Sequence, residues 1–213
     1  MIVVSLCDLS GNAVRDWARA GFECYCVDVQ HSIRRPRKER VGAGVIRFVW
    51  GDVRTWTPPA RPAFVMAWPP CTDVAVSGAR DFAVKGLARL TDALTLFSAC
   101  HHAAAWSGAP FMIENPVGVL SSHVRRPDYT FDPCDYAGYA DNPAAEAYTK
   151  KTCLWVGGGF VMPERRPVDA ALGSLMHLMP PSEGRAGARS LTPTGFARAV
   201  FLANAPRVEV LAA

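Results

Sequence analysis

Two consecutive prolines and a cysteine end a short apolar run, and this stretch constrains the fold more than any other. Residues 63–67 (AFVMA) have the pattern of a buried strand in a parallel sheet. Pro69 and Pro70 cannot supply the next ladder hydrogen bond, so the chain must leave the sheet there. Cys71 therefore lies just beyond the carboxyl end of the strand, at the edge where open α/β sheets bind ligands.

Cys71 has two interpretations. Cysteines that are not in disulfides are usually buried and behave as small hydrophobic side chains. A position after a strand-ending Pro-Pro, followed by Ser77, Gly78 and Arg80 in an expected mobile loop, favours a nucleophile instead. The rest of the chain has to distinguish between the two.

Composition limits the class of protein. A chain of 213 residues has room for one α/β domain, and 50% hydrophobic with 20% charged residues argues against disorder. No apolar run approaches the roughly 18 residues of a membrane span. Residues 1–6 lack a basic segment ahead of them, which indicates a first buried strand and not a signal peptide. We therefore expect a cytoplasmic protein with no membrane partner.

The cysteines and the net charge give weaker limits. Seven cysteines are an odd number, and no pair has the Cys-x-x-Cys spacing of a zinc site, so we expect reduced thiols and no metal. The net charge of +4 permits nucleic-acid binding without requiring it.

The first 30 residues predict a βαβ unit. Residues 2–9 form a strand, a small-residue turn around Gly11 opens a helix over residues 13–20, and residues 22–30 form a second strand that contains Asp28. An acid about 20 residues after such a turn is typical of sites for adenosine ligands. The single glycine disfavours a dinucleotide, and a plain βα connection is the alternative.

The middle of the chain repeats this pattern of strands that end in acids. Residues 31–40 form a basic loop, either solvated surface or, less favoured, a phosphate contact. A third strand over residues 45–49 is followed by Asp52, placed to accept a hydrogen bond from an adenine amine. After the fourth strand, residues 87–106 have the apolar periodicity of a helix.

The second half contains another carboxylate at a strand end. Residues 111–113 form a fifth buried strand followed directly by Glu114, where desolvation would tune the carboxyl for acid–base chemistry; an ion pair at the sheet edge is the alternative.

Residues 117–151 mix basic and aromatic side chains, which could hold nucleic acid or form a small core of their own. Residues 152–156 form a sixth strand. Thr192 and Pro193 are expected to open a last helix that ends near residue 204. The fold class is thus α/β, with a doubly wound, mostly parallel sheet.

In chain order these segments resemble the cytosine-5 DNA methyltransferases, and more closely the short phage-type members. The resemblance covers about the first three quarters of the chain and the segment from Ser190 to Ala197. It implies a Rossmann-like, S-adenosylmethionine-dependent methyltransferase fold in a bacterial or phage-infected cell. The motifs that carry it are Asp8-Leu9-Ser10-Gly11, Asp28, Gly51-Asp52-Val53, Pro69-Pro70-Cys71, Glu114-Asn115-Pro116, residues 150–157, and Ser190-x-Thr192-Pro193-x-Gly195-Phe196-Ala197.

The resemblance also implies residue roles. Cys71 would add to carbon 6 of cytosine, Glu114 would bind the ring nitrogen and exocyclic amine, and Lys150 would assist catalysis. The base would be flipped out of duplex DNA, and residues 72–85 would close over it. The implied S-adenosylmethionine contacts are Asp8, Leu9, Ser10, Gly11, Asn12, Asp28, Val29, Asp52, Val53 and Pro70. The implied DNA contacts are Ser77, Arg80, Arg125, Arg126 and Lys151.

Two departures from the family pattern affect specificity. Many members carry a Gln-x-Arg-x-Arg run where this chain has Tyr148-Thr149-Lys150-Lys151-Thr152, and lysine lacks the fork geometry of arginine. Larger members also have a target-recognition domain. We expect a single domain over residues 1–213 with a small target-recognition insertion at about residues 120–148 and 157–189, acting as a monomer. The alternatives are methylation of RNA or a nucleotide, and a catalytically silent DNA-binding protein.

Overall fold

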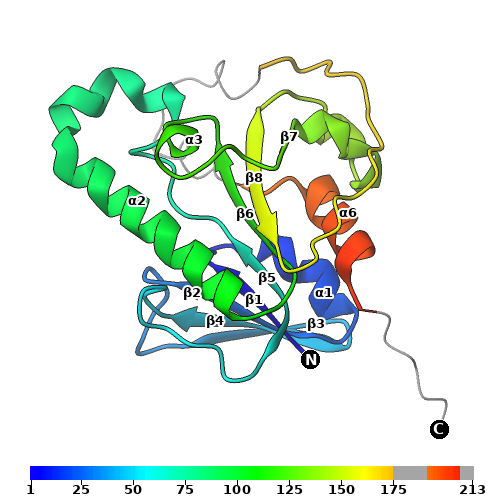
Figure 1. The fold of residues 1–213 in the computed structure, drawn as a ribbon. Coiled ribbons are helices and arrows are strands. Elements are labelled where there is room, and N and C mark those ends of the chain that lie inside the picture. The colour runs from blue at the N-terminus through cyan, green and yellow to red at the C-terminus, as the bar shows by residue number, and fades with distance from the viewer. Residues whose placement is uncertain (175–190, 207–213) are drawn as a thin grey trace, which may run out of the picture.

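A mixed sheet organises the described part of the chain. The structure is a computed structural model that describes residues 1–174 and 191–206. Within these residues the sheet has eight strands in the order β3-β4-β2-β1-β5-β6-β8-β7 (Figure 1). The strands are β1 (Ile2–Leu6), β2 (Glu23–Asp28), β3 (Arg37–Val41), β4 (Gly44–Trp50), β5 (Pro62–Ala67), β6 (Phe111–Pro116), β7 (Tyr129–Phe131) and β8 (Thr152–Gly157).

The central strands β4, β2, β1, β5 and β6 are parallel. Strand β3 is antiparallel to β4, β8 is antiparallel to β6, and β7 is antiparallel to β8. Every residue of β1 is buried, as expected for the middle strand of a sheet that is covered on both faces. The predicted α/β class with a mostly parallel sheet is confirmed.

Helices cover both faces of the sheet, which makes the fold doubly wound (Figure 1). On one face, Phe97 and Cys100 of α2 pack into a core with β1, β5 and β6. On the other face, Trp17 of α1 and Phe196 of α6 pack into a second core. The α-helices are α1 (Arg15–Arg19), α2 (Phe82–Trp106), α3 (Leu120–His123) and α6 (Thr194–Asn204). The 3-10 helices are Asn12–Val14, Val76–Asp81, Pro133–Asp135, Ala137–Tyr139 and Pro143–Glu146. None of the helices within the described ranges has the length and apolar character to cross a bilayer.

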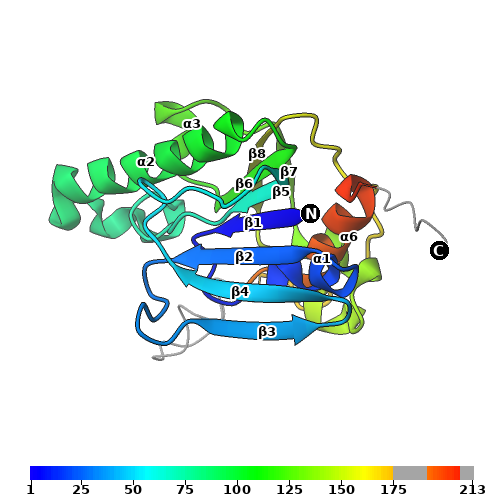
Figure 2. The same ribbon diagram turned by 90° about the horizontal axis from the view of Figure 1, so that it is seen from below.

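The basic segment over residues 31–40 was expected to be a loop, and this is wrong for its second half. Its last residues form β3, which pairs with β4 at one edge of the sheet (Figure 2). Charged side chains on an edge strand oppose further strand pairing, which explains a strand with so polar a sequence. The guanidinium of Arg37 also lies over the Phe48 ring, 3.4 Å from its centroid, so the basic character is partly used in packing.

The segment after Cys71 is more regular than the predicted loop. It contains the 3-10 helix Val76–Asp81 and a short helical turn from Phe82, which opens α2; beyond Gly86 the helix runs over residues 87–106, as predicted. Gly86 interrupts the helix with φ 74°, a conformation that other residues adopt at a cost. The first turns of α2 therefore bend away from the part of the helix that packs on the sheet.

Two segments beyond β6 pack against each other. The N–H of Val168 donates to the carbonyl of Cys134 (2.9 Å), and the N–H of Leu172 donates to the carbonyl of Ala147 (2.9 Å). The buried ring of Phe131 stacks on Phe196 of α6 at 3.9 Å between centroids. Residues 131–149 and 160–174 thus form one small layer over α6. Residues 175–189 of the predicted recognition insertion lie outside the described residues.

Candidate active site

The strand order sets a switch point between β1 and β5. From β1 the chain proceeds to β2 and β4 on one side, and then returns to β5 and β6 on the other. Ligands of open α/β sheets bind outside the carboxyl ends of the strands at such a point. The predicted site segments lie at this edge: residues 7–12 after β1, Asp28 at the end of β2, Asp52 after β4, residues 68–71 after β5, and Glu114 in β6.

Asp8 organises the turn after β1. Its buried Oδ1 accepts hydrogen bonds from the backbone N–H groups of Ser10 (3.0 Å) and Gly11 (2.7 Å), and from the Ser10 hydroxyl (3.1 Å). Gly11 has φ 69°, and a Cβ there would lie 3.0 Å from the Phe48 ring. Among the predicted cofactor residues, Asp8 therefore shapes the loop, whereas the side chains of Leu9, Ser10 and Asn12 are exposed or partly exposed.

The loop after β2 lies against this turn. The His31 ring contacts the backbone oxygen of Asp8 through Nε2 at 3.0 Å. Asp28 ends β2 with a partly exposed carboxylate, and its Oδ1 accepts a hydrogen bond from the N–H of Gln30 (2.8 Å). A carboxylate at this end of β2 has the right chemistry for the hydroxyls of a ribose.

The carboxylate expected to hold adenine already has a protein partner. Arg54 donates from Nε and from its backbone N–H to Asp52 Oδ1, at 2.9 and 3.0 Å. These hydrogen bonds, first among them that from the Arg54 side chain, lower the pKa of Asp52. Val53 is buried in the core. Any adenine amine bound by Asp52 would share the carboxylate with Arg54.

Large apolar side chains are exposed on the loops of three adjacent strands. Leu9 follows β1, Val29 follows β2, and Trp50 ends β4; they are 50, 56 and 45% exposed. Exposed apolar residues that cluster at a ligand-binding edge indicate a surface for an apolar group such as the face of a purine. Leu9 and Val29 are among the predicted cofactor contacts, whereas Trp50 is not; the sequence signal for Trp50 is its position two residues before Asp52.

The backbone around Cys71 is held in a defined turn. Its carbonyl accepts hydrogen bonds from the N–H groups of Val74 (3.1 Å) and Ala75 (2.9 Å). Lys85 Nζ donates to the carbonyl of Thr72 (2.8 Å) and pairs with Asp73 (2.9 Å). The Cys71 side chain is partly exposed and Pro70 is exposed. Cys71 is therefore partly exposed, on a backbone that the start of α2 holds in place.

The same turn is joined to the segment that follows Glu114. Buried Asn115 donates from Nδ2 to the carbonyl of Pro69 (2.8 Å). The N–H of Val119 donates to the carbonyl of Val74 (2.9 Å), and a Cβ on Gly118 would lie 2.0 Å from that carbonyl oxygen. Backbone contact this close brings the loop of Cys71 beside the end of β6.

Glu114 lies in a small pocket beside Trp68. The register pairs Ala67 with Ile113, so the next residues, Trp68 and Glu114, are neighbours. The pocket holds about 10 Å³, room for one water molecule, so a pyrimidine could enter only if its walls moved. Burial raises the pKa of Glu114, and the charge of Lys150 opposes this rise. The lining residues are Trp68, Glu114, Phe131, Lys150, Thr152, Leu191, Thr192, Pro193 and Phe196.

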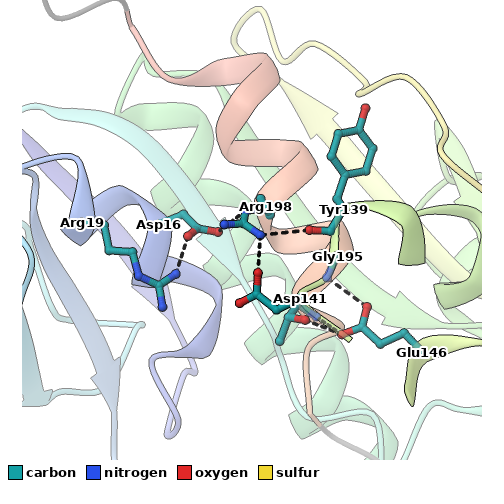
Figure 3. A network of polar contacts seen from close by, with 8 residues as sticks. Asp16, Arg19, Tyr139, Asp141, Glu146, Gly195 and Arg198 are labelled. Carbon is teal, nitrogen blue, oxygen red and sulfur yellow. Dashed lines mark hydrogen bonds and ion pairs between the residues drawn. The ribbon is translucent and has the colours of Figure 1, made fainter. Parts of the chain in front are cut away.

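Helix α6 supplies one wall of this pocket, and the capping residue differs from the prediction. Thr192 was expected to cap α6, but Pro193 is at the N-cap and makes no side-chain capping bond. The cap is Glu146, whose carboxylate accepts hydrogen bonds from the N–H groups of Thr194 (2.5 Å) and Gly195 (2.9 Å) (Figure 3). No signal in the sequence near α6 could have identified this partner.

The predicted DNA contacts differ in how their side chains are used. Ser77 and Arg80 are exposed on the 3-10 helix that follows the Cys71 turn, where Arg80 pairs with Asp81 at 3.5 Å. Arg126 and Lys151 are also exposed. Arg125 pairs with Asp128 (2.8 Å), so part of its charge is compensated within the protein.

A scan against protein-family models finds no match, and neither does a comparison with curated proteins. Among solved structures, the chain is similar to a prophage-encoded E. coli protein described as a candidate DNA modification methyltransferase. The two share 16% sequence identity with a TM-score of 0.46, and the match covers 74% of this chain and 46% of that chain. This chain thus spans about half the length of that structure. The fold assignment here rests on the strand order and the two cores.

Proposed function

We propose that this protein transfers a methyl group from S-adenosylmethionine to carbon 5 of cytosine in DNA. The observation that carries the proposal is the joining of the Cys71 loop to the end of β6 at one sheet edge. The loop carries the partly exposed Cys71, and β6 carries Glu114, a carboxyl with a raised pKa. A nucleophile beside a carboxyl that remains protonated to higher pH suits addition to a pyrimidine ring.

The side chains divide the chemistry as follows. The Cys71 thiolate adds to carbon 6, while Glu114 donates a hydrogen bond to ring nitrogen 3 and so stabilises the enamine-like electrons that reach carbon 5. S-adenosylmethionine supplies the electrophilic methyl group that carbon 5 attacks. Removal of the proton from carbon 5 then allows Cys71 to leave by β-elimination. The positive charge of Lys150 acts on Glu114 and limits the rise in the pKa of this carboxyl.

The residues after β1, β2 and β4 fit an adenosine-type cofactor. Asp28 offers a carboxylate for ribose hydroxyls, and Leu9, Val29 and Trp50 offer exposed apolar surface for a purine. The glycine at residue 11 allows the turn after β1 to remain tight. This arrangement supports S-adenosylmethionine as the cofactor.

Exposed cationic residues near the Cys71 loop and the end of β6 favour DNA as the substrate, because phosphates supply most of the affinity in protein–DNA binding. Arg80 follows the Cys71 turn, and Lys151 follows Lys150. We further propose that the layer formed by residues 131–149 and 160–174 contributes to target recognition, because it packs on α6 beside the pocket of Glu114.

The direct test is methyl transfer from labelled S-adenosylmethionine to DNA, followed by mass spectrometry of the nucleosides. We expect 5-methyldeoxycytidine with the wild-type protein and a loss of at least about 10³-fold with Cys71→Ala. Bisulfite sequencing of the same DNA would give the sequence context. Preferential methylation of RNA or of a nucleotide, or tight DNA binding without turnover, would contradict the proposal.

A further inference from the structure

A chain of buried and part-buried hydrogen bonds joins the pocket of Glu114 to the turn after β1. Trp68, which lines the pocket, donates from Nε1 to the Ser5 hydroxyl at 3.0 Å. Ser5 donates to Asp8 Oδ2 at 2.7 Å. Asp8 Oδ1 in turn accepts the N–H groups of Ser10 (3.0 Å) and Gly11 (2.7 Å). The chain thus extends from the wall of one predicted site to the backbone of the other.

The direction of this chain is fixed by the chemistry of its members. An indole nitrogen can only donate, so the Ser5 oxygen must accept from Trp68. The single hydroxyl proton of Ser5 is then available for Asp8, which accepts it as a carboxylate. Cys26 Sγ also lies 3.7 Å from the same Asp8 oxygen. Reversal would leave a buried donor without an acceptor, which is costly.

The position of Ser5 argues for a role beyond packing. Ser5 is fully buried in β1, where each neighbour in the strand is apolar, and Asp8 is 5% exposed. An apolar residue at this position would leave the Trp68 N–H without its acceptor and Asp8 Oδ2 without its hydroxyl donor. The hydroxyl also connects two elements that β1 alone would not connect. A continuous hydrogen-bond network of this kind is a physical route along which two sites can be coupled.

We infer that Ser5 is a positioning residue that couples the cofactor loop, residues 8–12, to the orientation of Trp68 at the base pocket. The inference rests on the proposed function, because it assumes that S-adenosylmethionine binds this loop. Contact with the cofactor orders the loop through Asp8, and Ser5 passes this order to the Trp68 indole. By linkage, a base held against Trp68 favours the cofactor-bound loop to the same degree.

The test follows the indole N–H of Trp68 by NMR. The chain has six tryptophans, so protein labelled with ¹⁵N-tryptophan should give six indole signals, and Trp68→Phe identifies the one that belongs to Trp68. We expect S-adenosylhomocysteine to shift this signal in the wild-type protein. In Ser5→Ala, S-adenosylhomocysteine should still bind, but the shift of the Trp68 signal should be lost.

Two controls separate coupling from a loss of stability. Trp155 donates from Nε1 to the carbonyl of Arg125 at 2.9 Å, away from the turn after β1, so its signal should not move in either protein. Ser5→Thr retains the hydroxyl and should retain the Trp68 shift, even if the added methyl group lowers the melting temperature. A shift that depends on the hydroxyl and not on the melting temperature supports the inference.

The failures are distinguishable. If S-adenosylhomocysteine binds Ser5→Ala and shifts the Trp68 signal as in wild type, the coupling is overturned and the proposed function stands. If S-adenosylhomocysteine does not bind the wild-type protein by calorimetry, the proposed function and this inference fall together.

Discussion

The carboxylate of Glu146 caps helix α6 from 48 residues earlier in the chain, through its hydrogen bonds to the N–H and hydroxyl of Thr194 (2.5 and 2.6 Å). Glu146 is 8% exposed and is the partner of the helix N-terminus, where a negative charge is favourable. Arg198 of the same helix bonds Asp141 (2.6 Å), so a second polar contact holds α6 to this segment (Figure 3). The position of α6 against the pocket of Glu114 therefore depends on residues from the predicted recognition insertion.

Loss of this cap should affect both stability and the pocket. Glu146→Ala removes the acceptor for two backbone donors of α6, and we expect a loss of about 1–2 kcal/mol in the free energy of unfolding, measured with urea. Arg198→Ala removes the pair with Asp141, a hydrogen bond to the carbonyl of Tyr139 (3.2 Å) and a 3.9 Å contact with Asp16. Because the guanidinium is partly exposed, we expect a smaller loss, below about 1 kcal/mol. Equal losses in the two variants would contradict the capping role.

Replacement of Glu114 by glutamine should stabilise the protein while it abolishes methyl transfer. Because burial raises the pKa of Glu114, ionisation costs folding free energy as the pH rises through the folded-state pKa. Glu114→Gln removes this cost, so its melting temperature should exceed that of the wild type at pH 7. Below the unfolded pKa both proteins carry a neutral side chain, and the difference should vanish.

Asp52→Asn is the matched control for this prediction. Hydrogen bonds from Arg54 lower the pKa of Asp52, so its contribution is present at neutral pH and is lost as the pH falls through the folded-state pKa. Asp52→Asn should therefore lower the melting temperature slightly at pH 7. A lower melting temperature for Glu114→Gln at pH 7 would show that the ionised form of Glu114 is favoured in the fold.

Much of this arrangement could be predicted from the sequence, because the signals were local. The apolar runs predicted six strands at their observed places, and the polar residue after each run indicated the ligand-binding edge. Strand β3 was missed because its sequence, RKERV, is charged, and its pairing with β4 comes from the hairpin at Gly42. Strand β7 has three residues and no periodicity of its own.

The supporting residues of the site could not be predicted, because their roles depend on contacts distant in sequence. Ser5 and Trp68 are 63 residues apart, and they meet because β1 and β5 are neighbours in the sheet. Nothing in the sequence around Glu146 marks it as the cap of a helix that begins 48 residues later. Asp52 and Arg54 are only two residues apart in the sequence, yet the sequence does not indicate that the guanidinium of Arg54 points toward Asp52.

The thiols should differ in their reactivity toward iodoacetamide. Cys71 and Cys7 are partly exposed, whereas Cys24, Cys26 and Cys100 are buried. Burial raises the pKa of Cys24 to about 12 and keeps it a poor nucleophile at neutral pH. Peptide mapping after limited alkylation should find Cys71 labelled well before the five buried thiols, which are Cys24, Cys26, Cys100, Cys134 and Cys153. Cys7, whose Sγ lies 3.8 Å from that of Cys100, should be intermediate. Early labelling of Cys24 or Cys26 would contradict the packing described for β2.

The contact between the Cys71 loop and the segment that follows β6 can be tested at Gly118. A Cβ there would lie 2.0 Å from the carbonyl oxygen of Val74, so Gly118→Ala must force the Cys71 loop and the end of β6 apart. We expect a loss of roughly 1–3 kcal/mol in stability and a large loss of methyl transfer in the surviving folded protein. Gly78→Ala is the control, because a Cβ at Gly78 would lie 3.3 Å from the carbonyl oxygen of Thr72, a much milder contact. Comparable activity in the two variants would show that the two segments need not be joined.

The central claim is that Cys71 forms a covalent bond to cytosine, and a trapped adduct tests it most directly. Duplex DNA that contains 5-fluorocytosine blocks the final elimination, because the fluorine at carbon 5 cannot leave as a proton does. With S-adenosylmethionine present, we predict a protein–DNA adduct that survives denaturation, that maps by mass spectrometry to Cys71, and that Cys71→Ser abolishes. Absence of an adduct with DNA that the wild-type protein binds, or an adduct that persists in Cys71→Ser, would contradict the claim.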